Sequence, residues 1–291
     1  MRKGYILFLL TLCCFSASAQ ILSDSFLIDH NNRSFHFKKP SLTNHQLSLI
    51  FVLHGSGGTG EGIMKSAVKL EAIAESENII LVYPDGYKKY WNECRKSATS
   101  AANIENIDEN SFFTKMIGYF ISKYQINQGR VFVIGTSGGG HMAYKLAITM
   151  PQQFKAITAI IANLPDTSNM DCSESKAPMS VMIINGTSDT TNPYNGGEVK
   201  IQQVKLGKVR STDETFSYWA TLAGYRGNPK KENLPDTDPS DGKTIEKYSY
   251  MKKGKPEVVL LKVINGKHDY PNDINVYLEA WSFFKRQINL K

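Results

Sequence analysis

The feature that most constrains the fold of this chain is an apolar, β-branched run that stops at a glycine-rich turn containing a serine. Residues 131–134 read Val-Phe-Val-Ile, and residues 135–139 read Gly-Thr-Ser-Gly-Gly. The pattern G-x-S-x-G between a strand and a helix is typical of a nucleophile elbow, where the chain turns so sharply that the serine is strained. Glycines on either side avoid a clash between a Cβ and the neighbouring backbone. We therefore expect Ser137 to stand above a sheet edge as a nucleophile.

The same five letters also occur in ordinary glycine-rich turns that only connect a strand to a helix, so the flanking segments must decide between the two interpretations. Residues 131–134 predict a buried strand, and residues 141–150 predict a helix that ends before Pro151. This order of strand, turn and helix is the one that an elbow requires.

Apolar runs of strand length alternate with segments of helical periodicity along the chain. The predicted strands are 46–54, 79–83, 131–134, 156–161, 181–184 and 258–264. The predicted helices are 63–77, with Val68 on its apolar face, then 112–124, 141–150, 215–222 and 274–284. Continuous apolar strands indicate a parallel sheet covered on both faces. We predict an α/β fold of the α/β-hydrolase type, with a mostly parallel central sheet and its chemistry beyond the carboxyl ends of the strands.

The N-terminus has the pattern of a secretory signal peptide. Residues 1–3 include two basic residues, residues 5–15 are apolar, and small residues precede Ala19. This pattern predicts cleavage after Ala19, and hence a secreted or periplasmic protein. A lipid-modified Cys13 is disfavoured because Leu12 before it is not small. Residues 20–291 are predicted to form a single catalytic domain.

Charge and length limit the partners of the mature chain. The formal net charge of +7 falls to +5 once Arg2 and Lys3 are removed, and the remaining basic residues are scattered. Scattered charge argues against nucleic-acid binding. After residues 5–15 no segment is long and apolar enough to span a membrane, so no stable membrane association is expected. The sequence leaves the oligomeric state open.

Two cysteines, Cys94 and Cys172, remain after removal of the signal peptide. In an exported protein they predict one disulfide, and two separate buried thiols are the alternative. The chain contains neither CxxC nor HExxH, and no cluster of histidine, cysteine and aspartate has the spacing of a zinc site. We therefore predict no metal and no organic cofactor.

A serine nucleophile needs a base and an acid that orients the base. His268 lies between the last predicted strand and the last predicted helix, where the base falls in the chain order serine, acid, histidine. Asp189 follows the predicted strand 181–184 and is the favoured acid. Asp166 is its rival, and Asp171 is farther from any strand end.

Two amides are predicted to form the oxyanion hole. Gly138 follows the nucleophile, and Ser56 lies in the glycine-rich loop after the strand 46–54. These are the two places from which an α/β-hydrolase takes its oxyanion donors. An ordinary glycine-rich turn is the alternative for residues 55–60. His54, at the end of the strand, is interpreted as a loop-shaping residue, and His141 as packing against the sheet.

Six motifs together resemble a known group of exported enzymes. They are Leu53–Gly58, Tyr83–Gly86 with Trp91-Asn92, Gly135–Met142, Asn185–Asp189, Pro193–Gly197 and Gly266–Pro271. In this order and spacing they are similar to the α/β-hydrolases of carbohydrate esterase family 1 and the poly(3-hydroxybutyrate) depolymerases, which include feruloyl and acetyl xylan esterases. The resemblance implies Ser137, His268 and Asp189 as the triad.

The resemblance also implies substrate contacts and shows where this chain departs from the group. It suggests that Trp91 and Tyr194 lie near the substrate cleft. The group commonly has a glycine before the histidine and Thr-Trp after it, but this chain has Lys267 before and Asp269-Tyr270 after. Tyr270 keeps an aromatic surface at that place and is a third candidate for substrate binding. Between acid and base, residues 197–255 form a polar insertion, where Trp219 is expected to pack on the body rather than face substrate.

The sequence therefore predicts a secreted serine esterase that acts on feruloyl or acetyl esters of plant cell-wall polysaccharide or oligosaccharide. Cleavage of a polyester such as poly(3-hydroxybutyrate) is the alternative among hydrolases. A non-catalytic binding protein on a hydrolase scaffold is the alternative of another class, because a fold does not determine a function. The complete set of serine, acid and histidine argues against that last alternative.

Overall fold

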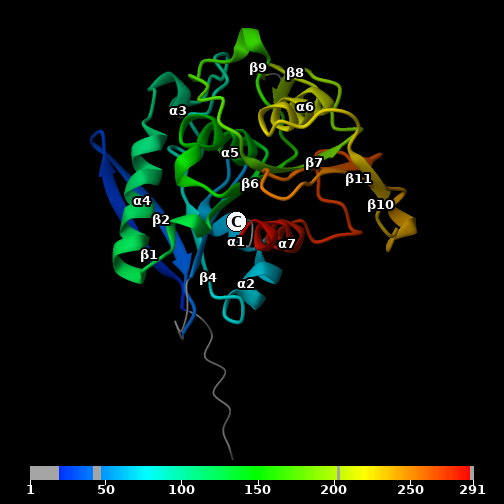
Figure 1. Cartoon of the computed structure of the whole chain (residues 1–291). Helices are drawn as coiled ribbons and strands as arrows, with labels where there is room; N and C mark the ends of the chain where they lie inside the picture. Colours follow the sequence, from blue (N-terminus) through cyan, green and yellow to red (C-terminus); the bar gives the residue numbers. More distant parts are fainter. Residues whose placement is uncertain (1–19, 42–46, 202–203, 289–291) are drawn as a thin grey trace, which may run out of the picture.

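A ten-stranded sheet forms the centre of the molecule in the computed structural model, which describes residues 20–41, 47–201 and 204–288 (Figure 1). The predicted signal peptide lies outside the described residues. The strands are β1 Leu22–Ile28, β2 Asn31–Lys38, β3 Ser48–Leu53, β4 Ile79–Pro84, β5 Val131–Thr136, β6 Ala156–Ile160, β7 Ser180–Gly186, β8 Gly197–Ile201, β9 Val204–Val209, β10 Lys230–Asn233, β11 Thr244–Tyr250 and β12 Val258–Ile264. The order in the large sheet is β1-β2-β4-β3-β5-β6-β7-β12-β11-β10, and β8 and β9 form a separate hairpin.

The six strands from β4 to β12 in this order are parallel to one another. β3, β4, β5, β6 and β7 are buried along their whole length. Their continuous apolar sequences are explained by helices on both faces of the sheet, because a strand covered on two sides has no polar face. The predicted mostly parallel α/β-hydrolase sheet is confirmed.

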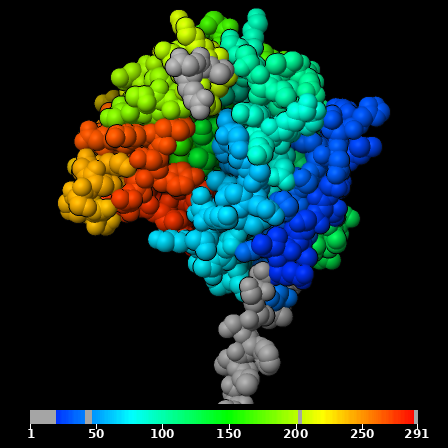
Figure 2. All heavy atoms as spheres, turned by 180° about the vertical axis from the view of Figure 1, so that it is seen from behind, coloured from blue at the N-terminus to red at the C-terminus, as the bar shows by residue number. Residues whose placement is uncertain are grey.

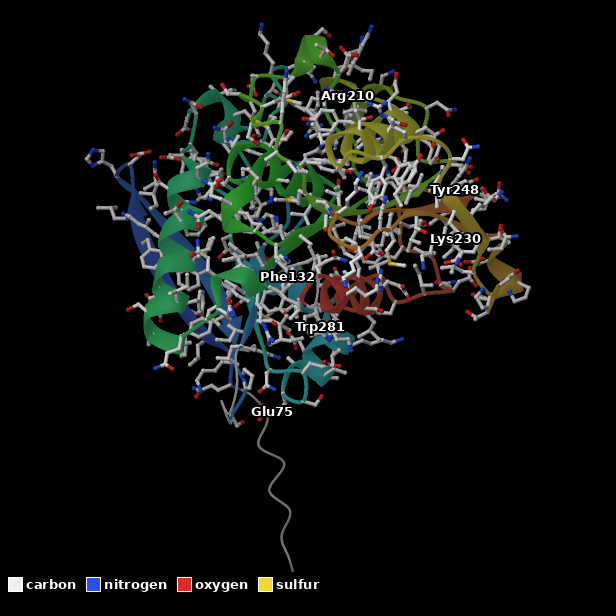
Figure 3. All side chains as sticks on the ribbon, in the orientation of Figure 1. Glu75, Phe132, Arg210, Lys230, Tyr248 and Trp281 are labelled. Atoms are coloured by element: carbon white, nitrogen blue, oxygen red, sulfur yellow. A yellow bond between two sulfur atoms is a disulfide. The ribbon has the colours of Figure 1, made fainter. Side chains whose placement is uncertain are left out.

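Two apolar cores lie on opposite faces of this sheet. The helices are α1 Gly60–Met64, α2 Val68–Ala74, α3 Ala101–Ile104, α4 Glu109–Tyr124, α5 Gly138–Thr149, α6 Thr212–Leu222 and α7 Val276–Ile288. α4, α5 and α6 pack against one face, and α1, α2 and α7 pack against the other. Figure 3 shows the labelled Phe132 and Trp281 near α7, and the ring of Phe132 stacks on Phe284 at a centroid distance of 4.6 Å. Successive side chains along each central strand therefore point into opposite cores.

The edges of the sheet are antiparallel and were not predicted. β1 and β2 form a hairpin on one edge, and β11 and β10 extend the other. Figure 2 shows the blue β1–β2 hairpin and the yellow and orange β10–β11 segment on opposite sides of the molecule. These strands are half-exposed, so they lack the continuous apolar runs that identify the central strands.

The single helix expected over residues 63–77 is wrong. The structure has two short helices, α1 and α2, separated by residues 65–67. The break changes which residues face the sheet: Ala67 is fully buried, whereas Val68, expected on the apolar face, is 58% exposed. Helical periodicity does not continue across a break of this kind.

The insertion at residues 197–255 contributes to the body of the fold as well as to its surface. It contains the β8–β9 hairpin, helix α6, and the strands β10 and β11 of the main sheet. Trp219 of α6 is 1% exposed and stacks on Tyr144 of α5, so the expectation that it packs on the body is confirmed. Because this segment is polar, the strands β10 and β11 of the main sheet are not recognisable from its sequence.

Within residues 20–41, 47–201 and 204–288, no helix combines the length and hydrophobicity needed to traverse a bilayer.

Candidate active site

Ser137 occupies the sharp turn between β5 and α5. Its φ of 53° and ψ of −117° are a strained conformation for a residue with a side chain. A Cβ on Gly135 would lie 2.0 Å from the carbonyl oxygen of Gly139, and a Cβ on Gly139 would lie 2.4 Å from that of Leu53. Both glycines are therefore required by the close approach of backbone to backbone, as the sequence predicts.

His268 connects Ser137 to Asp189. The Nε2 atom of His268 lies 3.0 Å from Oγ of Ser137, and its Nδ1 atom lies 2.7 Å from Oδ2 of Asp189. The side chain of Asp189 is 2% exposed and that of His268 is 26% exposed. The structure thus brings together the three residues that the sequence proposes as nucleophile, base and acid, although they lie on three separate loops.

Asp189 is held from behind by the turn in which it lies. Its other oxygen, Oδ1, accepts hydrogen bonds from the backbone N–H groups of Thr191 and Asn192, each at 2.8 Å. A carboxylate bound in this way has a fixed orientation toward the imidazole. The rival Asp166 instead accepts hydrogen bonds from the N–H and the hydroxyl of Ser168, where it begins a short 3-10 turn.

The two predicted oxyanion donors lie against each other. Gly138 is the first residue of α5, whose first N–H groups have no acceptor within the helix. A Cβ on Gly138 would lie 2.9 Å from the backbone nitrogen of Ser56. The Ser56 loop therefore packs directly on the start of α5, and only a glycine fits between the two segments.

His54 shapes the loop that carries Ser56, as predicted from its position. Its Nε2 accepts a hydrogen bond from the N–H of Gly86, and its Nδ1 lies 2.7 Å from the carbonyl oxygen of Gly55. Its backbone carbonyl accepts a hydrogen bond from Nε1 of Trp91. Burial lowers the pKa of the His54 imidazole, so the neutral form that accepts from Gly86 is favoured.

A cavity of about 430 Å³ opens beside the oxyanion donors. Ser56 and Gly138 line it, together with the aromatic residues Tyr90 and Trp91. The lining also includes a buried ion pair, in which Nε of Arg95 lies 2.8 Å from Oε1 of Glu93. The cavity is thus lined by aromatic residues and by a buried ion pair, and it reaches Gly138, the residue after Ser137.

A disulfide fixes the wall that carries this ion pair. Cys94 and Cys172 are bonded, with their Cα atoms 5.2 Å apart, so the predicted disulfide is confirmed. The backbone of Lys96 donates a hydrogen bond to the carbonyl of Asn169, and the Asn169 side chain accepts one from the N–H of Ser97. The segment 93–97 is therefore attached to the segment 169–172 by backbone hydrogen bonds as well as by the disulfide.

Two of the three predicted substrate-binding residues lie outside this cavity. Trp91 lines it, but the hydroxyl of Tyr194 donates a hydrogen bond to Asp213 and the ring is largely buried. Tyr270 points behind the elbow, where its hydroxyl lies 2.7 Å from Oγ1 of Thr136 and 2.9 Å from the hydroxyl of Tyr277. Tyr270 thus connects the loop of His268 to the residue before Ser137.

His141 is buried, as its predicted packing on the sheet requires. Its pKa lies well below the ordinary histidine value, first because of burial and then because of the nearby positive charge of Arg95. The site residues that sequence reasoning missed are Glu93 and Arg95. Their spacing of two in a polar segment has the appearance of a solvated loop, and only the neighbouring Cys94 indicates a fixed structure.

The residues that the structure describes include no group of three or more histidine, cysteine or acidic side chains arranged to hold a metal ion.

Comparison with known proteins identifies the family. The sequence model of the family described as Phospholipase/Carboxylesterase matches residues 38–217. Acetylxylan esterase A of Talaromyces purpureogenus is 26% identical over 216 residues, covering 67% of this chain and 55% of that protein. Feruloyl esterase B of Neurospora crassa is 33% identical over 112 residues, 38% of this chain and 37% of that protein. The chain thus spans about half, or less, of the length of these two relatives.

A solved structure shows the same fold. The acetyl xylan esterase from Aspergillus awamori superimposes with a TM-score of 0.64 at 19% sequence identity. The match covers 91% of this chain and 99% of that protein.

Proposed function

The chain belongs to the phospholipase/carboxylesterase family, and from this premise we propose that it is a serine esterase whose triad is Ser137, His268 and Asp189. The observation that carries the proposal is the unbroken line of hydrogen bonds from Oγ of Ser137 through both ring nitrogens of His268 to Asp189. This is the arrangement by which an imidazole accepts a proton from a serine while a carboxylate holds its tautomer.

In the proposed reaction, Nε2 of His268 takes the hydroxyl proton as Oγ of Ser137 attacks the ester carbonyl. The N–H groups of Ser56 and Gly138 stabilise the negative charge that develops on the carbonyl oxygen. His268 then gives its proton to the leaving alcohol, and an acyl-serine remains. Water, activated by the same imidazole, releases the acid and restores Ser137. This sequence requires no metal or organic cofactor.

The proposed substrates are feruloyl or acetyl esters on plant cell-wall polysaccharide. The names of the two relatives support this class, since one is an acetylxylan esterase and the other a feruloyl esterase. The motifs shared with carbohydrate esterase family 1 support it as well. We also propose that the protein is exported, because a disulfide such as Cys94–Cys172 persists in oxidising compartments.

The test is acid release from a xylan that carries both acetyl and feruloyl esters. The wild type is compared with Ser137→Ala, which keeps the fold but lacks the nucleophile. We expect acetate or ferulate from the wild type only, and the dominant acid identifies the ester. If neither acid appears while a fluorophosphonate still labels Ser137, the polysaccharide substrate is wrong and a polyester film becomes the next substrate to try.

A further inference from the structure

The loop that carries His268 lies beside a second loop, which belongs to the insertion between acid and base. β11 pairs antiparallel with β12, and Thr244, the first residue of β11, lies opposite Ile264, the last residue of β12. Residues 236–243 precede β11, and residues 265–273 follow β12, so the register of the two strands places these loops next to each other. We call residues 236–243 the bracing loop.

Hydrogen bonds join the bracing loop to residues on both sides of His268. On the N-terminal side, Nδ2 of Asn265 donates to the carbonyl oxygen of Gly242 at 2.9 Å. On the C-terminal side, Nδ2 of Asn272 donates to Oδ2 of Asp238 at 2.8 Å. Because these contacts lie before and after the histidine, the bracing loop restrains the whole segment that carries the imidazole.

Asp273 connects the start of the bracing loop to the body of the fold. Its Oδ1 atom accepts hydrogen bonds from the backbone N–H groups of Thr237 and Asp238, at 2.7 and 3.1 Å. A carboxylate that accepts two backbone N–H groups has a fixed position. α7 begins shortly afterwards at Val276, which is buried in one of the two cores. The bracing loop is therefore attached to a packed helix as well as to the sheet.

Lys243 adds an ion pair directly beside the proposed base. Its Nζ atom lies 3.2 Å from each oxygen of Asp269, the residue after His268. The side chain of Lys243 is 14% exposed, and that of Asp269 is 47% exposed. An ion pair with a half-exposed partner contributes little to stability, because water screens the two charges. Its effect is therefore expected on the position of Asp269 rather than on the stability of the fold.

The rest of the His268 loop is held by other parts of the molecule. Before the histidine, the N–H of Ser188 in the acid loop donates a hydrogen bond to the carbonyl oxygen of Gly266 at 2.8 Å. After it, the hydroxyl of Tyr270 contacts the strand that leads to the elbow. Asp269 lies between these two attachments, and Lys243 holds its side chain.

We propose that Lys243, acting through Asp269, is a positioning residue that holds the loop of His268 in its reactive place. The inference rests on the proposed esterase function. In this place Nε2 of His268 lies 3.0 Å from Oγ of Ser137. Proton transfer requires hydrogen-bond distance, so even a small displacement of the imidazole slows the reaction.

The test is the steady-state kinetics of Lys243→Met with p-nitrophenyl acetate. Methionine keeps an apolar stem and removes the charge. We expect kcat to fall about threefold to tenfold, because the imidazole is less well placed. KM should not change, because acylation and deacylation both use His268 and slow together. Labelling of Ser137 by a fluorophosphonate should slow as well. Lys243→Arg keeps the cation and should restore kcat.

Lys231→Met is the matched control. Lys231 lies in the same insertion, and its Nζ atom is 2.6 Å from Oε1 of Glu246. This ion pair connects β10 to β11 and involves no residue of the His268 loop. The variant loses a lysine–carboxylate pair as Lys243→Met does, and its kcat should equal that of the wild type.

A double variant tests whether Lys243 acts through Asp269. If the two side chains act as a pair, Lys243→Met combined with Asp269→Asn should have the kcat of the single variants. Losses that multiply would show that Lys243 acts by another route and would overturn the inference. If Lys243→Met does not fold, Asp269→Asn alone should show the same fall in kcat with unchanged KM.

The outcomes separate this inference from the function on which it rests. An unchanged kcat in Lys243→Met, or an equal loss in Lys231→Met, overturns the role of Lys243 and leaves the esterase intact. A raised KM with unchanged kcat overturns it too, because Lys243 would then contact substrate. If the folded wild type neither hydrolyses the ester nor is labelled on Ser137, the proposed function fails and the inference fails with it.

Discussion

The two sides of Ser137 differ in how completely their polar groups are satisfied. On the side of His268, each oxygen of Asp189 has a partner: Oδ2 meets the imidazole and Oδ1 accepts two backbone N–H groups. On the side of the cavity, Nη1 of Arg95 has none within the described residues. On the first side, every oxygen of the carboxylate is hydrogen-bonded, as suits groups that hold one geometry through a reaction. On the second side, one buried nitrogen of the guanidinium is unpaired.

The largest effect on activity is expected on the His268 side of Ser137. Asp189→Asn should lower kcat/KM for an ester by about 10⁴-fold, because the amide no longer holds the tautomer of His268 that accepts the serine proton. Steady-state kinetics with p-nitrophenyl acetate measure the loss. Asp166→Asn is the control and should leave kcat/KM unchanged, since Asp166 only caps a turn. The opposite result, a loss of activity in Asp166→Asn alone, would identify Asp166 as the acid of the triad.

The next-largest effect concerns the disulfide that holds the cavity-lining segment of Glu93 and Arg95 in place. Replacing Cys94 and Cys172 together by alanine should lower the free energy of unfolding by about 4 kcal/mol, because the bond closes a loop with a sequence separation of 78. Urea unfolding measures the change. Adding a reducing agent should lower the unfolding midpoint of the wild type and leave that of the variant where it is. A wild-type midpoint that does not respond to reduction contradicts this prediction.

The stability of both sides should depend on pH through two buried histidines. The pKa values of His54 and His141 are lowered by burial, so the folded protein binds protons less readily than the unfolded chain. Their contribution to stability is present above the unfolded pKa of about 6.5 and is lost as the pH falls below it, with a limiting slope of about 1.4 kcal/mol per pH unit for one histidine.

The measurement for this prediction is urea unfolding between pH 7.5 and 5.5. In His141→Gln the slope of unfolding free energy against pH should be shallower than in the wild type, whatever the absolute stability of the variant. Parallel slopes for the two proteins would show that His141 does not titrate differently in the folded state.

The smallest effect is expected from the hydrogen bond between Tyr270 and Thr136, the residue before Ser137. Tyr270→Phe removes the hydrogen bond to Thr136 and should lower kcat about threefold to tenfold without changing KM, because the loop of His268 loses one anchor to the elbow strand. Tyr87→Phe is a control that removes an exposed tyrosine–glutamate hydrogen bond. A raised KM with unchanged kcat would instead favour the substrate contact that the sequence suggests for Tyr270.

The sequence predicts the centre of this molecule well because burial leaves a strong pattern there. The strand before Ser137 is apolar at successive positions, and the glycines of the elbow are required by backbone contacts of 2.0 and 2.4 Å. Strand β2, the second from one edge of the sheet, is not predicted, because only alternate residues such as Phe35 and Phe37 are buried. A search for alternation, rather than for continuous apolar runs, would have found it.

The cavity-lining pair Glu93 and Arg95 could not be predicted from the sequence. Glu93 and Arg95 are charged residues in a polar segment, where solvated side chains are the rule. They are buried because the disulfide and the bonds to Asn169 draw two distant loops together. The pairing of loops 72 to 78 residues apart depends on tertiary structure and leaves little local signal.

The central claim is that Ser137, activated by His268, is the nucleophile, and covalent labelling tests it most directly. The wild type and His268→Gln are incubated with a fluorophosphonate, and the modified residue is located by peptide mass spectrometry. We expect a single adduct on Ser137 of the wild type, and labelling slowed by orders of magnitude in His268→Gln. A folded wild type that remains unlabelled, or that carries its adduct on another residue, would contradict it.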